Sequence, residues 1–127
     1  MLNLLLVALG GAVGSVGRYV LNDRFRALLG AGWPSGIFTI NVLGGFLMGC
    51  IVGFLAHRGG ADQEKWRVLV AVGVLGGFTT FSAFSLDVAL MIERRAYGQA
   101  AAYSSASVVV SVVALFAGLM LMRRLFA

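Results

Sequence analysis

Long apolar stretches alternate with short polar ones along this chain. The apolar stretches cover roughly residues 2–21, 37–56, 66–92 and 99–122. A bilayer core about 30 Å thick is crossed by about 20 apolar residues in helical form. The pattern therefore predicts an all-α integral membrane protein with four transmembrane helices, in one domain over residues 1–127.

The polar stretches mark the ends of these spans. Residues 22–26 carry Asp23, Arg24 and Arg26 and end the first span. A turn over residues 30–34 follows, in which Trp33 is placed as an interfacial anchor. Residues 57–64 form the only strongly polar loop, where the lone histidine, His57, is expected to be solvated.

The third apolar stretch is too long for one straight span. About 27 helical residues would rise about 40 Å. At its middle, residues 76–85 read Gly-Gly-Phe-Thr-Thr-Phe-Ser-Ala-Phe-Ser, and two glycines followed by two threonines make a poor helix interior. A break there would expose backbone groups at mid-membrane depth, which is tolerated where they are buried in protein or line a wet cavity, and which often holds ions. A glycine kink used only for packing remains the alternative.

Composition and charge agree with the membrane interpretation. The chain is 60% hydrophobic and 12% charged, whereas soluble domains carry about 25% charged residues. Its net charge of +5 does not indicate nucleic-acid binding, because the basic residues are scattered at span ends. The one cysteine, Cys50, lies in an apolar run, and the N-terminus lacks the basic region of a cleaved signal peptide.

Basic residues are balanced between the two sides of the predicted bundle. One side carries Arg58, Lys65, Arg67, Arg123 and Arg124, and the other carries Arg18, Arg24, Arg26, Arg94 and Arg95. An excess on one side would fix the orientation. The equal number of basic residues on the two sides therefore favours a chain that inserts in both orientations and forms an antiparallel dimer. In so short a chain, equal numbers could also arise by chance. Glycines at helical spacing in the first two spans suit close helix contacts, either within a subunit or between subunits.

Several polar side chains within the spans could donate hydrogen bonds to an anion. Asn41 lies in the second span, and Tyr103, Ser107 and Ser111 follow one another at i, i+4 and i+8, on one stripe of the fourth helix. Hydrogen bonding between helices is the alternative use of such residues.

Aromatic and charged residues add to this pattern. Phe81 and Phe84 share a helix face, and their positive ring edges could meet an anion, with Ser82 and Ser85 beside them; core packing is the alternative. Arg18 could raise the local anion concentration in a vestibule or simply snorkel.

Asp87 is the one acidic residue within a span. Because a carboxylate would repel an anion, we expect it to pair with an arginine or to cap backbone. A proton-coupled exporter needs a membrane-embedded carboxylate, and the first span has none. No nucleophile–base pair or metal-ligand spacing is visible, so an enzyme is not expected.

Residues 76–85 closely resemble the signature of the Fluc/CrcB fluoride channels, as do residues 41–45 and the glycine-rich run that ends in Arg18. The resemblance covers essentially the whole chain. It implies a dual-topology, antiparallel homodimer with two pathways. Such a dimer would export fluoride passively from the cytoplasm across the bacterial inner membrane and so lower fluoride toxicity.

The resemblance also implies site residues. A structural Na⁺ at the dimer two-fold would be held by the backbone carbonyls of Gly76 and Thr79. The fluoride pathway would comprise Arg18, Asn41, Phe81, Ser82, Phe84, Ser85, Tyr103, Ser107 and Ser111. Two positions depart from the family: Ile37 replaces a common threonine, with Thr39 nearby, and Asp87 replaces a common glutamate.

Overall fold

The computed structural model describes residues 1–30, 34–58, 60 and 62–126, and all regular secondary structure in these ranges is helical. Trp33, predicted as an interfacial anchor, lies outside the described residues. The helices are α1 (Leu2–Leu29), α2 (Ser35–Arg58), α3 (Gln63–Trp66), η1 (Arg67–Leu75), α4 (Gly76–Phe78), α5 (Phe81–Glu93) and α6 (Tyr97–Leu125).

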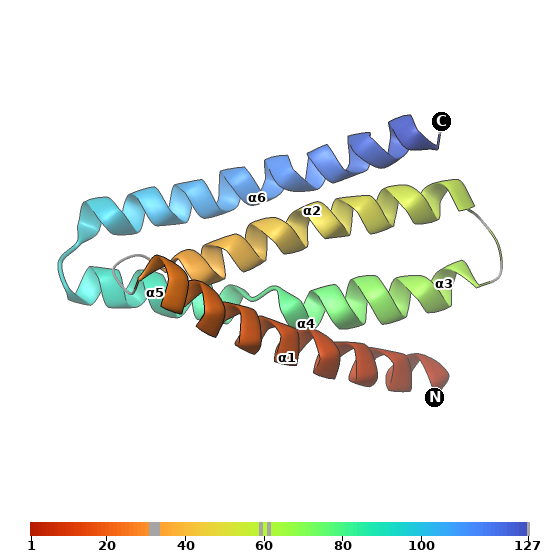
Figure 1. Cartoon of the computed structure of the whole chain (residues 1–127), viewed down its shortest axis with the longest axis horizontal. Helices are drawn as coiled ribbons and strands as arrows, with labels where there is room; N and C mark the ends of the chain where they lie inside the picture. Colours follow the sequence, from red (N-terminus) through yellow and green to blue (C-terminus); the bar gives the residue numbers. More distant parts are fainter. Residues whose placement is uncertain (31–33, 59, 61, 127) are drawn as a thin grey trace.

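The described helices form four rods that are long and apolar enough to cross a membrane, which confirms the predicted four spans. The third rod is Gln63–Glu93 and contains α3, η1, α4 and α5. Figure 1 shows that both termini and the α2–α3 connection lie at one end of the bundle, and that the α1–α2 and α5–α6 connections lie at the other. The most extensive contacts join α2 to α6 and α1 to η1.

The first helix is longer than the sequence pattern predicted. It continues through the polar residues 22–26 to Leu29 and ends at Gly30, whose φ of 87° favours glycine. The expectation that residues 22–26 end the helix was wrong, because charged residues such as arginine favour helix as well as leucine does. A change in hydropathy marks the edge of an apolar stretch and does not by itself stop a helix.

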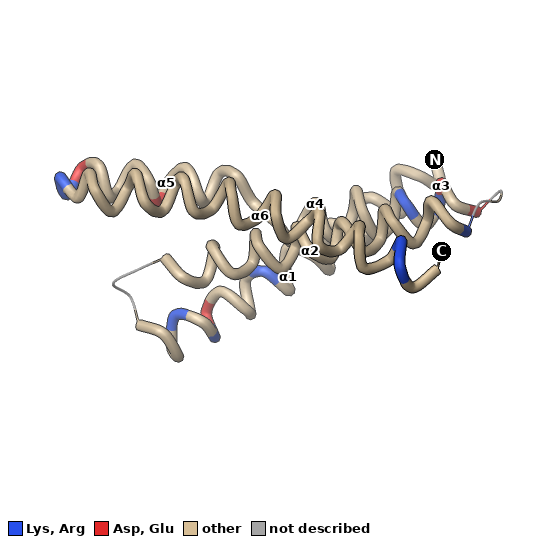
Figure 2. The backbone as a smooth tube through the Cα atoms, turned by 90° about the horizontal axis from the view of Figure 1, so that it is seen from above, with Lys and Arg blue, Asp and Glu red and all other residues tan. Residues whose placement is uncertain are grey.

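Charged residues gather at the two ends of the bundle. Figure 2 shows Lys and Arg at both ends, with few charges along the middle. The described structure places the α2–α3 connection with the end of α6, so that end carries five basic residues. The other end carries four, because Arg18 lies within α1, close to Thr79.

Glycines bring the helices of one subunit into backbone contact. A Cβ atom on Gly14 would overlap the Val74 carbonyl and lie 2.8 Å from the Phe78 nitrogen. A Cβ atom on Gly49 of α2 would likewise overlap the Leu115 carbonyl of α6. The small residues that the sequence left open between two uses therefore serve contacts within the subunit.

Residues Arg67–Leu75 form a nine-residue π-helix, η1, which the sequence did not predict. π-Helices are rare and are mostly single-turn bulges. The segment packs along α1, where a Cβ atom on Gly73 would lie 3.0 Å from the Gly10 Cα. Its apolar composition does not distinguish it from an α-helix.

Candidate functional site

The third rod loses helical geometry at two residues, Thr79 and Thr80. Both are extended, with φ/ψ of −79°/155° and −150°/127°. The Thr79 hydroxyl donates to the Leu75 carbonyl (2.9 Å), and the Thr80 hydroxyl accepts from the Ala83 amide (3.2 Å), which makes it the N-cap of α5. One threonine thus closes the preceding helix and the next opens the following one.

Asn41 of α2 binds this interruption with both ends of its amide. Its Nδ2 donates to the Thr80 carbonyl (3.1 Å), and its Oδ1 accepts from the Thr80 amide (2.9 Å). Thr80 is buried, so these bonds satisfy backbone groups that would otherwise be costly to bury. Because the Thr80 amide goes to Asn41, the Gly76 carbonyl loses the partner that a continuous α-helix would give it.

Arg18 and Ser82 lie together on one side of the interruption. Arg18 Nη1 is 3.5 Å from the Thr79 carbonyl, a long hydrogen bond, and the Ser82 hydroxyl is 3.3 Å from that of Thr80. Arg18, Ser82 and Thr80 line a cavity of about 400 Å³, called here the Arg18 cavity. The guanidinium is therefore held at the break and is not free at a headgroup surface.

A groove of about 380 Å³ lies at the interruption between α2, α5 and α6. It is called here the Asn41 groove. Five of the predicted pathway residues line it: Asn41, Phe81, Phe84, Ser107 and Ser111. The Ser111 Oγ is buried and has no hydrogen-bond partner among the described residues. The structure thus brings together an amide and hydroxyl groups from two helices, one of them with a free donor.

The two phenylalanines differ sharply in exposure. The Phe81 side chain is 79% exposed, whereas Phe84 is 9% exposed. Their ring centroids lie 5.5 Å apart, and the Phe84 ring continues the row to Tyr103 at 5.3 Å. Phe84 therefore belongs to the packing of this subunit, and Phe81 presents its ring at the surface.

The buried Tyr103 and the half-buried Asp87 form a pair that sequence reasoning missed. Tyr103 is fully buried and its hydroxyl donates to Asp87 Oδ2 (3.1 Å), a partner that the sequence analysis did not name. Arg26 also attracts the Asp87 carboxylate, in line with the expected arginine. The two residues lie eight positions on either side of Arg95, whose φ of 62° marks the turn between α5 and α6. In an antiparallel helix pair that turns at Arg95, positions at equal distance from the turn lie side by side. The equal spacing of Asp87 and Tyr103 from the turn could therefore have predicted their contact.

Two other predicted positions lie apart from the Asn41 groove. Ser85 is exposed, and its hydroxyl donates to the Phe81 carbonyl of its own helix (2.9 Å). Ile37 is buried with Phe84 and Tyr103 in an apolar cluster, so its side chain fills core space.

These features define a multi-pass helical membrane protein with hydrogen-bond donors gathered around an interrupted helix. Residues 5–119 match the family described as CrcB-like protein, Camphor Resistance (CrcB). The chain belongs to the CrcB family.

Similar chains carry one functional name. A protein of Phenylobacterium zucineum is 67% identical over 124 residues, 98% of each chain. Proteins of Caulobacter vibrioides (strain NA1000 / CB15N) and Agrobacterium fabrum are 61% and 49% identical, over 100% and 99% of this chain and 100% of each relative. All three are named fluoride-specific ion channel FluC.

Proposed function

We propose that this chain is a fluoride-specific ion channel that lets fluoride leave the cytoplasm passively. The observation that carries the proposal is the Asn41 groove, because its lining holds amide and hydroxyl groups and no acidic side chain. Donors without fixed negative charge suit an anion that must be partly dehydrated and then released. The names of the full-length relatives support fluoride as that anion.

A pathway through one subunit follows from three neighbouring cavities. The Arg18 cavity shares Thr80 with the Asn41 groove, and shares Ile37 and Leu86 with a third cavity of about 420 Å³. Arg26 and Arg94 line that third cavity at the end of the bundle, together with the acidic Asp87 and Glu93. In our proposal, the anion enters through this cavity on the side of the arginines, and Arg18 and Ser82 receive it at the break. Asn41 and Ser111 then carry it onward, past the Phe81 and Phe84 ring edges.

The functional unit in this proposal is an antiparallel, dual-topology homodimer whose third transmembrane helix is broken at mid-membrane. The Asn41 groove is open on one side, and the Phe81 ring on its lining is largely exposed, so a second subunit would close the groove. Nearly equal numbers of basic residues at the two ends, five against four, support insertion in both orientations. The inner membrane of a bacterium is the proposed location.

The proposed dimer also contains a structural Na⁺ at its two-fold axis. The Gly76 carbonyl has lost its ordinary helical partner, and the Thr79 carbonyl accepts a long bond from Arg18. Backbone oxygens at such an interruption suit a hard cation. Carbonyls of Gly76 and Thr79 from both subunits would hold the ion. When bound, it would supply positive charge and a link between the subunits.

Fluoride efflux from liposomes that contain the purified protein tests this function. A fluoride electrode should record rapid release, and a chloride electrode should record none from matched vesicles. Fluoride retention by vesicles that contain a folded dimer would overturn the proposal. Proton-driven cation export, with Asp87 as the carboxylate, would then be the hypothesis to test.

A further inference from the structure

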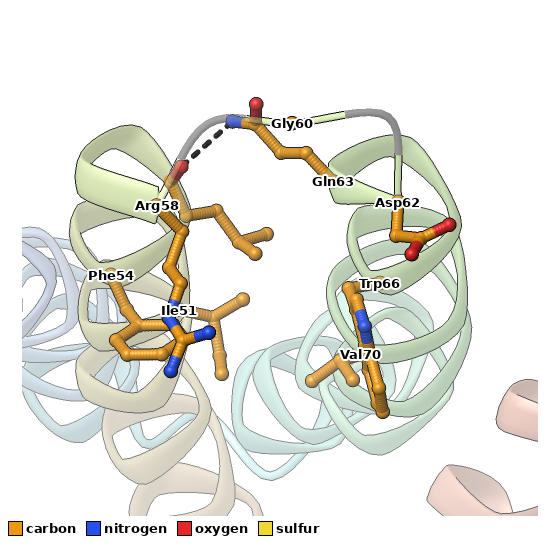
Figure 3. A pocket seen from close by; sticks show the side chains of 9 residues that line it. Ile51, Phe54, Arg58, Gly60, Asp62, Gln63, Trp66 and Val70 are labelled. Carbon is orange, nitrogen blue, oxygen red and sulfur yellow. Dashed lines mark hydrogen bonds between the residues drawn. The ribbon is translucent and has the colours of Figure 1, made fainter.

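A second cavity lies far from the interrupted helix, where α2 ends and α3 and η1 begin. It has a volume of about 490 Å³ and is called here the Trp66 cavity. In Figure 3, Ile51 and Phe54 of α2 face Trp66 and Val70 of the third rod across this space. Its inner walls are apolar, so it does not resemble the donor-lined Asn41 groove.

The end of this cavity is closed by a polar link between the two helices. Gln63 Nε2 donates to the Leu55 carbonyl (2.8 Å), one of the terminal carbonyls of α2 (Figure 3). The bond fixes the start of α3 against the end of α2. The space between the helices is therefore held open by the fold and does not depend on a ligand.

A cation without a carboxylate partner lies at the mouth. The Arg58 guanidinium is 5.2 Å from the centroid of the Phe54 ring, and that ring makes an edge contact (5.4 Å) with Phe126, the residue that follows α6. Asp62 also lines the cavity but pairs with Lys65 (3.9 Å), and Glu64 pairs with Arg67 (3.7 Å). Of the ion pairs between described residues at this end, none includes Arg58.

Depth and charge together indicate the occupant. The cavity lies at the end of two predicted spans, where we expect headgroups to meet acyl chains. Trp66 is half-exposed beside it, as interfacial tryptophans are. Five basic residues stand against two acidic ones at this end: Arg58, Lys65, Arg67, Arg123 and Arg124 against Asp62 and Glu64. Basic pockets between transmembrane helices bind anionic headgroups.

We propose that the Trp66 cavity binds one anionic phospholipid, with an acyl chain between Phe54 and Val70 and the phosphate on Arg58. The guanidinium offers several donors in a planar fork that matches phosphate oxygens. The apolar walls account for the chain, and the unpaired arginine accounts for the negative headgroup. This site does not depend on fluoride conduction.

Trp66 fluorescence tests the proposal in the full-length protein. The Trp33→Phe variant leaves Trp66 as the only tryptophan, and brominated acyl chains quench tryptophan on contact. Liposomes of phosphatidylcholine should contain brominated phosphatidylglycerol or brominated phosphatidylcholine at equal mole fraction. We expect Trp66 to prefer the anionic lipid about fivefold, the effect of one basic residue near the surface.

Two further variants test whether Arg58 causes the preference for the anionic lipid. Arg58→Gln should abolish the preference, whereas Arg123→Gln, at the same end but outside the cavity lining, should keep it. Equal quenching by the two lipids would overturn the anionic selectivity. An absence of quenching by either would show that protein, such as a second copy of the chain, covers the cavity, and would overturn the site. Soluble phosphate cannot mimic the positive result, because the quencher is on the acyl chain.

Discussion

The side-chain amide of Asn41 and the backbone of Thr80 hold each other by two reciprocal hydrogen bonds of 3.1 and 2.9 Å. One side chain thereby joins α2 to the break in the third rod and satisfies both polar backbone groups of a buried residue. The same amide has a second N–H and lines the Asn41 groove. Asn41 is thus a candidate donor to the anion and also joins α2 to Thr80, a link called here the Asn41 clasp.

Replacing Asn41 by aspartate should remove both roles at once. Asn41→Asp keeps an acceptor for the Thr80 amide but sets a carboxylate oxygen against the Thr80 carbonyl and adds negative charge to the groove. We expect at least about a tenfold loss of fluoride efflux and about 1–3 kcal/mol of lost stability, from the unsatisfied carbonyl and the buried charge. Efflux with a fluoride electrode and thermal unfolding in detergent measure the two effects.

The same substitution at Asn3, an exposed residue at the start of α1, is the matched control and should change neither quantity. Unchanged efflux in Asn41→Asp would remove Asn41 from the pathway.

Ser111 allows function to be separated from stability. Its buried hydroxyl has no partner among the described residues, so Ser111→Ala breaks no hydrogen bond of the subunit. Thermal stability should stay the same or rise by about 1 kcal/mol, while fluoride efflux falls. Ser105→Ala, at an exposed position of the same helix, is the control. A variant with lower stability and normal efflux would show that Ser111 only joins helices.

Two neighbouring glycines of α1 should respond oppositely to alanine. Gly14→Ala would force a methyl group into the backbone of Val74 and Phe78 and should cost about 1–3 kcal/mol. Gly11→Ala meets no atom within 4 Å and should be neutral or stabilising by up to about 1 kcal/mol. Thermal unfolding of both variants in detergent checks this, and equal destabilisation would contradict the described α1–η1 packing.

Alanine substitutions at Phe81 and Phe84 should have different effects on stability and efflux. Phe84→Ala leaves a void beside Tyr103 and should cost about 3–5 kcal/mol. Phe81→Ala removes a ring that is 79% exposed in the subunit, so subunit packing should be kept while efflux and dimer stability fall. Cross-linking in liposomes together with efflux separates the two variants. A Phe81→Ala protein with normal dimerisation and efflux would place Phe81 in lipid.

Much of the fold could be predicted because hydropathy and length set the spans directly. The four rods and the non-helical Thr79 and Thr80 lie where apolar runs and poor helix formers predicted them. The path of α1 through residues 22–26 could not be read the same way, since hydropathy reports burial in lipid and says little about where helical hydrogen bonding ends. The turn at Gly30, with positive φ, was the true stop.

The candidate site was only partly predictable, because residue type does not reveal which partner a side chain finds. Asn41, Phe84 and Ser111 all line the Asn41 groove. The hydroxyl stripe on the fourth span and the predicted break in residues 76–85 had indicated such a grouping. Tyr103 lies on the same stripe, yet its hydroxyl turns to Asp87 across the α5–α6 hairpin. Ser85 bonds to its own helix. Such choices depend on distances between helices, which periodicity within one helix does not contain.

The π-helical segment Arg67–Leu75 bears on how this chain can change length during evolution. A π-turn holds one more residue than an α-turn, because each amide bonds to the carbonyl five positions earlier. Loss of a residue here would let a turn relax to ordinary α geometry, while the Gln63 link at one end and the Asn41 clasp at the other stay in place. Elsewhere in the third rod a deletion would rotate everything beyond it by about 100°. The segment is therefore where a membrane span of fixed thickness can tolerate a one-residue deletion in its gene.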